Sequence, residues 1–219
     1  MADSSQHRLF TIGHSTHSVE ALLDMLQRHD ITAVADVRSS PYSQYNYQFN
    51  RESFQADLKK VGIQYVYLGS KLGPRSDDPC CWENGKASYK RIAETSAFQE
   101  GLNRLRKGLG TYRIALLCAE KDPTGCHRMI LVCRHIRGRY PDIQHIREDG
   151  TLEAHAAAEN RLLKLFDLTP GGDLLNSHEE LLEIAYDKQG DKIAYSEDET
   201  AEQSKEQENK SGIQNGFKA

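Results

Sequence analysis

Thiol, carboxylate, imidazole and guanidinium side chains follow one another closely between residues 118 and 128. Cys118 and Glu120 come first, a turn-forming run separates them from Cys126, and His127 and Arg128 follow directly. Thiolates act as nucleophiles, while carboxylates and imidazoles act as general acids or bases. Arginine adds a fork of N–H donors that suits phosphate or carboxylate groups. We therefore predict Cys118, Glu120 and His127 as catalytic residues, and Cys126 and Arg128 as residues that bind the substrate.

The residues on either side of this segment predict the elements that position it. Residues 114–117 are a short apolar run, which is typical of a strand buried on both faces. Apolar residues recur at helical spacing from Met129 to Ile136, which predicts a helix with one buried face. Ligands bind beyond the carboxyl ends of parallel strands, and the free amides at a helix N-terminus attract anions. We therefore expect an anion-binding site where the strand passes into the helix.

Three further apolar segments end on polar residues. They cover residues 8–12, 31–35 and 63–67, and each predicts a strand. If these strands are parallel, their carboxyl ends lie along one edge of the sheet, together with the segment 118–128. The polar residues that follow them, which we predict to bind the substrate, are His14, Ser15, Asp36, Arg38 and Arg75. We expect no direct pair between Asp36 and Arg38, so that Asp36 orients another neighbour.

Residues 42–50 form a loop rich in tyrosine and amide side chains. Such a composition favours an adaptable contact surface over a core. We predict Tyr45 as a substrate-binding residue of this loop. Residues 70–89 make a second long irregular section, which is typical of a lid or binding loop.

The order of strands and helices predicts an α/β fold with a mostly parallel, Rossmann-like sheet of about five strands flanked by helices. The fifth strand falls at residues 143–146, a helix follows at 152–166, and Ser177 begins a helical C-terminal extension. Residues 1–195 are expected to form a single domain. Residues 196–219 are polar and poor in aromatic side chains, and are expected to be a disordered acidic tail.

Composition limits the classes of function. The 219 residues carry a net charge of −4, and residues 189–219 hold seven acidic and four basic side chains, so the remainder is nearly neutral. Five cysteines without framework spacing indicate a reducing compartment. The N-terminus lacks the apolar region of a secretory signal, and no run approaches a membrane span. We therefore expect a cytoplasmic protein without a membrane partner.

Several well-known site patterns are missing from the sequence. In the cysteine loops of tyrosine phosphatases and rhodaneses, arginine or the loop end lies about six residues beyond the nucleophile, where this chain has Thr124. Neither GxGxxG after the first strand nor GxxxxGK[ST] occurs, so no nucleotide cofactor is supported and the cofactor stays unknown. Zinc held by His14, Cys118, Cys126 or His127 is an alternative that we considered. Because paired CxxC spacing is missing, we predict no metal.

Five stretches together resemble a known family. They are TIGHS near the start, ADVRSSPYS, the YLG turn, CAEKDPTGCHR and HEELLEIAYDKQGDKIAY. The chain resembles the family catalogued as domain of unknown function 488 over roughly residues 9–195. The resemblance implies an α/β fold with the cysteine and CHR elements in one site, and no established reaction.

Two functions remain open from the sequence. The first is an enzyme that acts by cysteine or acid/base chemistry on a small phosphate- or carboxylate-bearing substrate, a class that includes nucleotide-like molecules. The second is a nucleic-acid-binding or repair-associated module that uses the same edge without catalysis, since the stretch 104–139 is rich in arginine and the loop 42–49 in aromatic rings. A packing role for Cys118 and Cys126 competes with the first, because free cysteines are commonly core residues, and Cys126 could alternatively resolve an oxidised Cys118.

Overall fold

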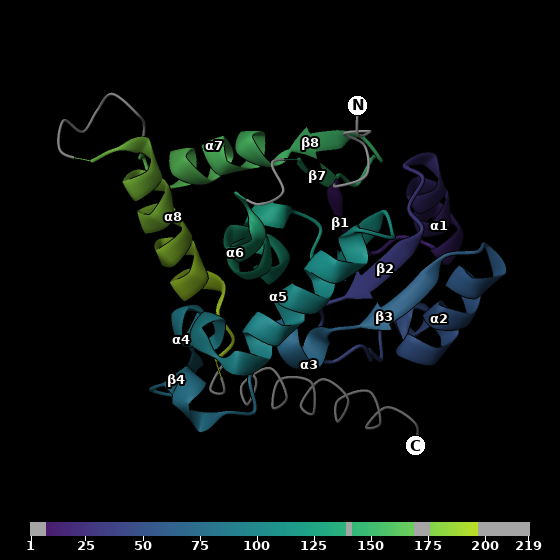
Figure 1. The fold of residues 1–219 in the computed structure, drawn as a ribbon, viewed down its shortest axis with the longest axis horizontal. Helices are drawn as coiled ribbons and strands as arrows, with labels where there is room; N and C mark the ends of the chain where they lie inside the picture. The colour runs from purple at the N-terminus through teal and green to yellow at the C-terminus, as the bar shows by residue number, and fades with distance from the viewer. Residues whose placement is uncertain (1–7, 139–141, 169–175, 197–219) are drawn as a thin grey trace, which may run out of the picture.

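The computed structural model describes residues 8–138, 142–168 and 176–196, and its main feature is a six-stranded sheet (Figure 1). The strand order is β3-β2-β6-β1-β7-β8. The strands of this sheet are β1 (Leu9–Gly13), β2 (Ala33–Asp36), β3 (Gln64–Tyr67), β6 (Ile114–Cys118), β7 (Ile143–Ile146) and β8 (Leu152–Ala154). The first five pair in parallel, and β8 pairs antiparallel to β7. This confirms the predicted α/β class with a mostly parallel sheet, with one more strand than the expected five.

Alternating side chains of the central strands enter two separate cores. Phe10, Ile12, Ala115 and Leu117 belong to the core on one face of the sheet, and Leu116 belongs to the core on the other. Every residue of β1, β2 and β6 is buried. Burial on both faces is what the continuous apolar runs of these strands predict, because helices cover both sides of a parallel sheet.

Helices cover the two faces unequally, as Figure 1 shows. Two helices, α1 (Val19–Arg28) and α2 (Arg51–Lys60), lie on one face. Six lie on or around the other face: α3 (Gly69–Leu72), α4 (Tyr89–Glu94), α5 (Ser96–Leu109), α6 (Arg134–Ile136), α7 (His155–Leu165) and α8 (His178–Ile193). The start of α8 is fixed by a capping box between Ser177 and Glu180.

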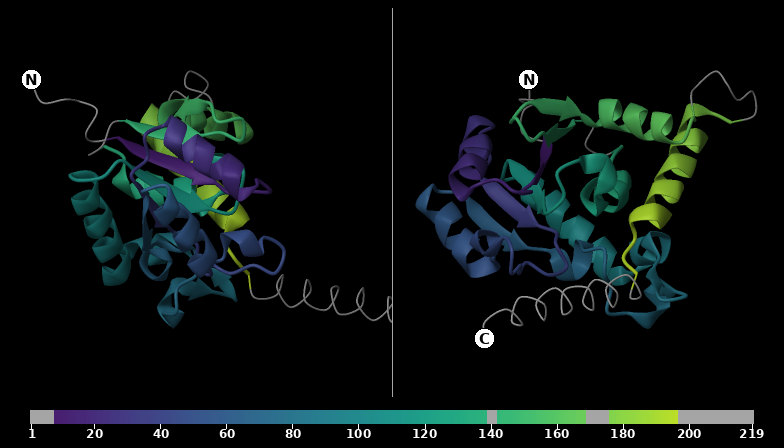
Figure 2. Two further views of the ribbon diagram at one scale, coloured as in Figure 1. Left: turned by 90° about the vertical axis from the view of Figure 1, so that its right-hand side faces the viewer. Right: turned by 180° about the vertical axis from the view of Figure 1, so that it is seen from behind.

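The irregular section after β3 contains a short hairpin. Its strands are β4 (Trp82–Glu83) and β5 (Lys86–Ala87), which pair with each other. Ala87 N–H donates to the carbonyl of Tyr195 at 2.9 Å, and Lys86 forms an isolated bridge with Ser196. The segment after α8 therefore lies against the hairpin, and both views of Figure 2 show the end of α8 reaching the region of α4 and β4.

The segment after Cys126, which was expected to be an ordinary α-helix, forms a different type of helix. A 3₁₀ turn covers Pro123–Gly125, a π-helix runs from Arg128 to Cys133, and α6 continues it. All six residues of the π-helix are buried. Single π-helical turns are rare in proteins, and those that occur often lie at functional sites.

No helix in the described part of the chain is both long and apolar enough to cross a membrane. Of the predicted tail, residues 196–219, only Ser196 belongs to the described residues, and it bridges to Lys86.

Candidate functional site

The carboxyl ends of β1, β2 and β6 bring the predicted site residues to one edge of the sheet. Gly13 is the register partner of Cys118, and His14 N–H donates to the carbonyl of Cys118 at 2.9 Å. On the other side of β6, Val37 N–H donates to the carbonyl of Leu117 at 3.1 Å. Residues 80 to 105 positions apart in the sequence thus become neighbours.

Four side chains from the end of β6 and the loop after it form a compact cluster. They are Cys118, Glu120, Cys126 and His127, and one donor atom of each lies within 4.8 Å of all the others. Both thiols donate to Oε2 of Glu120, at 2.8 Å from Cys118 and 2.9 Å from Cys126. Nδ1 of His127 lies 3.5 Å from the sulfur of Cys118 and 4.0 Å from that of Cys126. The two cysteines and the histidine are buried, and Glu120 is exposed.

Backbone groups fix the orientation of the cluster. Nε2 of His127 lies 2.9 Å from the carbonyl of Val37, which can only accept a hydrogen bond, so Nε2 carries a proton and donates it. Nδ1 therefore faces the two sulfurs. The N–H of Arg128 donates to the sulfur of Cys126 at 3.4 Å.

The charges of the cluster are coupled. The carboxyl end of Glu120 is partly buried against the two thiols, which raises its pKa, but the positive charge of His127 and the two thiol hydrogen bonds outweigh this, and the pKa falls to about 2. Burial lowers the pKa of His127, but its hydrogen bond with Cys126 and nearby negative charges outweigh burial and raise the pKa. Burial also raises the pKa of Cys126 well above its ordinary value.

Arg128, predicted to bind the substrate, lies beneath the loop instead of in an open site. Its guanidinium is fully buried and donates to the carbonyls of Glu120 and Lys121, at 2.6 and 3.0 Å. It also donates to Oγ1 of Thr11 at 3.3 Å. The expected anion site on free helix amides is absent from the described segment, because the amides of residues 128–130 already bond to the sulfur or the carbonyl of Cys126. Arg128 instead fixes the loop that carries Glu120.

Asp36 and Arg38 form a direct ion pair, so the expectation that they point apart is wrong. Nε and Nη2 of Arg38 donate to the carboxylate of Asp36 at 2.6–3.2 Å, and both side chains are buried. Tyr65 also donates to this carboxylate, at 2.8 Å. Nη1 of Arg38 lies 3.3 Å from Nε2 of His14. Burial and the charge of Arg38 lower the pKa of His14 to about 4, so this imidazole is neutral at pH 7 and can accept the hydrogen bond.

A cleft of about 320 Å³ opens beside the cluster. It is lined by Arg38, Ser39, Ser40, Tyr42, Pro74, Arg75, Cys118, Ala119, Glu120 and His127. Arg75 is exposed at its mouth, and its guanidinium carbon lies 3.7 Å from the centre of the Tyr195 ring. A second hollow of about 290 Å³, beside Tyr89 and Tyr195, shares Arg75, Glu120 and His127 with the first. Glu120 and His127 thus border both hollows.

Two other predicted residues lie at the rim without lining the cleft. Ser15 has a φ of 45°, in the left-handed region that is uncommon for a residue other than glycine, and its N–H donates to the carbonyl of Ala119 at 2.9 Å. Tyr45 is 75% exposed, and Tyr42 is the tyrosine of this loop that lines the cleft. A substrate contact for Ser15 or Tyr45 stays a prediction.

Close backbone approach at Gly13 holds the loop 119–127 against β1. A Cβ atom at this position would lie 1.9 Å from the carbonyl oxygen of Glu120. Only glycine therefore allows the end of β1 to approach the loop this closely. This packing explains the glycine at the end of β1.

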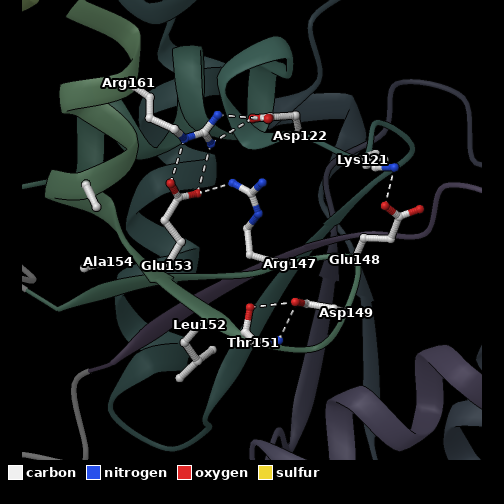
Figure 3. Close-up of a pocket in the computed structure, with 11 residues that line it drawn as sticks. Lys121, Asp122, Arg147, Glu148, Asp149, Thr151, Leu152, Glu153, Ala154 and Arg161 are labelled. Atoms are coloured by element: carbon white, nitrogen blue, oxygen red, sulfur yellow. Dashed lines mark hydrogen bonds and ion pairs between the residues drawn. The ribbon is translucent and has the colours of Figure 1, made fainter. Parts of the chain in front are cut away.

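A larger hollow, of about 860 Å³, lies elsewhere and differs in chemistry (Figure 3). Its charged side chains are engaged with one another: Arg161 bonds Asp122 and Glu153, Arg147 bonds Glu153, and Lys121 bonds Glu148. We do not assign the site to this hollow, because each of its three cationic side chains is paired with a carboxylate and its lining contains no thiol or imidazole. Through Asp122, its ion pairs instead hold the far side of the loop 119–127.

Residues outside the predicted set also build the site. Ser39 lines the cleft and accepts a hydrogen bond from Arg75 N–H at 3.1 Å, Tyr65 supports Asp36, and Tyr195 supports Arg75. The spacing of Tyr65 and Tyr67 in β3 places both on one face of the strand. The spacing could therefore have indicated that Tyr65 faces the same side of the sheet as other site residues. No pattern in the sequence predicts the contact between Tyr195 and Arg75.

Fold and site define an α/β protein with a thiol, imidazole and carboxylate cluster at the carboxyl edge of a mostly parallel sheet. A family model described as domain of unknown function DUF488 matches residues 18–134, and the chain belongs to this family. The matched range contains the cluster and Asp36, Arg38 and Arg75. No curated protein and no solved structure matches the chain.

Proposed function

We propose that the protein is an enzyme that acts on a small phosphate- or carboxylate-bearing molecule in the cleft beside Cys118. The observation that carries this proposal is the composition of the cleft wall. Arg38 and Arg75 line the same 320 Å³ space as Cys118, Glu120 and His127. Cationic forks that hold an anion next to such groups are the parts that catalysis on an anionic substrate requires.

The two arginines have different roles in this proposal. Arg38 is held rigidly by Asp36 and the carbonyl of Phe49, so its guanidinium is a fixed part of the cleft wall. Arg75 lies at the mouth over the Tyr195 ring, where it can turn toward an incoming anion. Arg128 has a structural role, because its donors are taken by backbone carbonyls and Thr11.

Replacing Arg75 by alanine should weaken the binding of a small anion by about 10- to 100-fold, because a charge-assisted hydrogen bond contributes roughly 1.5–3 kcal/mol. The binding of inorganic phosphate, sulfate and adenosine monophosphate, measured by isothermal titration calorimetry, checks this. Arg91→Ala is the matched control, since Arg91 is an exposed arginine that pairs with Glu83 outside the cleft.

A panel of phosphate and carboxylate esters then tests for catalysis. For a turned-over ester, Glu120→Gln should lower kcat by at least about 100-fold, the usual contribution of a general acid or base. Anion binding that is unchanged in Arg75→Ala, or turnover that is unchanged in Glu120→Gln, would contradict the proposal.

The exposed tyrosines of the loop 41–50 favour one second candidate, a module that binds single-stranded nucleic acid. Tyr42, Tyr45 and Tyr47 are 53%, 75% and 71% exposed, and bases stack on such rings. The arginine-rich stretch gives this candidate less support than the sequence indicated. Arg134 and Arg137 pair with acidic residues of α8, and Arg139 lies outside the described residues.

A salt titration separates the two candidates. If the loop grips a single strand, the logarithm of the association constant should fall linearly with the logarithm of salt concentration, by about 0.7 for each neutralised phosphate. Tyr45→Ala should then weaken binding by about 1–3 kcal/mol. Fluorescence anisotropy with labelled single- and double-stranded oligonucleotides measures both effects, and a flat salt response removes the second candidate.

A further inference from the structure

We infer that Cys118, Cys126, His127 and Glu120 form a binding site for one zinc ion. The four donors come from ten consecutive residues, and their ligand atoms lie within 4.8 Å of one another. The inference goes beyond the proposed function and stands on the donors themselves. It also specifies how the thiols are used, as ligands that hold a metal beside the cleft.

The donor set selects the class of metal. Two thiols, one imidazole nitrogen and one carboxylate oxygen are the ligands of Zn²⁺. Mg²⁺ and Ca²⁺ prefer oxygen ligands alone and would leave both sulfurs unused. Zinc is also redox-inert, so two neighbouring thiolates remain intact beside it.

The spacing of the atoms suits tetrahedral coordination. Bonds of about 2.0–2.3 Å place tetrahedral ligand atoms roughly 3.3–3.8 Å apart. The separations of His127 Nδ1 from the two sulfurs, 3.5 and 4.0 Å, are close to this range. Oε2 of Glu120 lies closer to the sulfurs, at 2.8 and 2.9 Å, and its exposed side chain can retract by the difference.

The surroundings supply the support that metal ligands need. A ligating histidine usually donates its other N–H to a carbonyl or carboxylate, and Nε2 of His127 does so to Val37 at 2.9 Å. The amide of Arg128 donates to the sulfur of Cys126. Zinc with two thiolates and one carboxylate carries one net negative charge, and the fully buried guanidinium of Arg128 offsets it.

Exposure divides the four ligands into two kinds. Cys118, Cys126 and His127 are buried and make a fixed set of three, whereas Glu120 is exposed and faces both hollows. Three fixed protein ligands with an exchangeable fourth position are typical of catalytic zinc sites. If the proposed function holds, the fourth position opens toward the anion at Arg75.

Metal analysis of the full-length chain tests the inference. The protein is purified under reducing conditions from zinc-supplemented cells. Inductively coupled plasma mass spectrometry should then find about one zinc ion per chain. Cobalt added to the chelated protein should give the intense sulfur-to-cobalt absorption and the visible bands of a tetrahedral site. Cys118→Ser and His127→Ala should each weaken zinc binding by more than about 100-fold, which exceeds the loss typical of outer-shell changes.

Matched variants keep the test decisive. Cys80→Ser and Cys133→Ala change an exposed and a buried cysteine outside the cluster, and both should retain the metal. Glu120→Gln changes an exposed side chain, so it should fold normally, and should bind zinc at least about 10-fold more weakly. Circular dichroism confirms that each variant is folded.

Three results would overturn the inference. They are a folded parent chain that takes up neither zinc nor cobalt, metal uptake that persists in Cys118→Ser, and a Cys118–Cys126 disulfide as the stable form under reducing conditions. Failure of the proposed function is distinguishable, because it would appear as a zinc-loaded chain that binds none of the anions. A metal-free chain that still binds phosphate through Arg75 would leave the proposed function intact.

Discussion

Replacing Asp36 by asparagine should lower the free energy of unfolding by about 3–5 kcal/mol, because it leaves a buried arginine without its negative partner. The carboxylate is fully buried and accepts hydrogen bonds from Arg38 and Tyr65. Urea denaturation followed by circular dichroism measures the change. The variant should also disturb the edge of the cleft, since Arg38 lines it.

Asp57→Asn is the matched control for this effect. Asp57 also forms an ion pair, with Lys60 at 2.7 Å, but the lysine side chain is 75% exposed to water. Exposed pairs contribute about 0–1 kcal/mol, so this variant should be almost as stable as the parent. Equal losses in the two variants would show that burial of the Asp36 pair has no energetic consequence.

Replacing Arg128 by methionine should destabilise the protein by about 3–5 kcal/mol, since a charged donor's hydrogen bonds contribute about 1.5–3 kcal/mol each and losses partly overlap. Methionine keeps much of the volume of the side chain but leaves the carbonyls of Glu120 and Lys121 without this donor. The loop 119–127 should therefore open more often. Hydrogen exchange of its amides, measured by mass spectrometry, should become faster, while exchange in α2 on the opposite face should change little.

Arg28→Met serves as the comparison for Arg128→Met. Arg28 is half exposed on α1 and pairs with Asp24 one helical turn away. Pairs of this kind contribute a few tenths of a kcal/mol. A loop that stays equally protected in Arg128→Met would contradict the positioning role of Arg128.

The edge of the sheet could be predicted from sequence because apolar runs end abruptly at polar residues. Residues 114–117 pass directly into the segment that starts at Cys118, and the structure places the ends of β1, β2 and β6 together. Parallel pairing follows from the order of strands and helices alone. The grouping of Cys118, Glu120 and His127 follows in turn, because they share one short loop.

The contacts of the two arginines could not be predicted in the same way. The pairing with β6 continues one residue beyond the end of β2, since Val37 N–H donates to the carbonyl of Leu117, and the side chains of Asp36 and Arg38 meet on one side of this extended segment. The expectation that the two side chains point apart overlooked this. The carbonyl groups that accept hydrogen bonds from Arg128 are positioned by the conformation of an irregular loop. Such a loop has no repeating sequence pattern from which its conformation could be predicted. Similarly, the π-helix from Arg128 to Cys133 has an apolar pattern that suits an ordinary helix equally well.

The position of β1 within the sheet has a consequence for folding on the ribosome. Leu9 pairs with Ile114 on one side and with Ile143 on the other, so β1 is synthesised before both of its partners, which lie more than a hundred residues further along the chain. Contacts of such long sequence separation slow folding. The nascent chain must therefore keep the apolar strand β1 unpaired until β6 and β7 have been synthesised. Because β1 also packs against the loop 119–127, this loop reaches its final shape only when β1 pairs with β6.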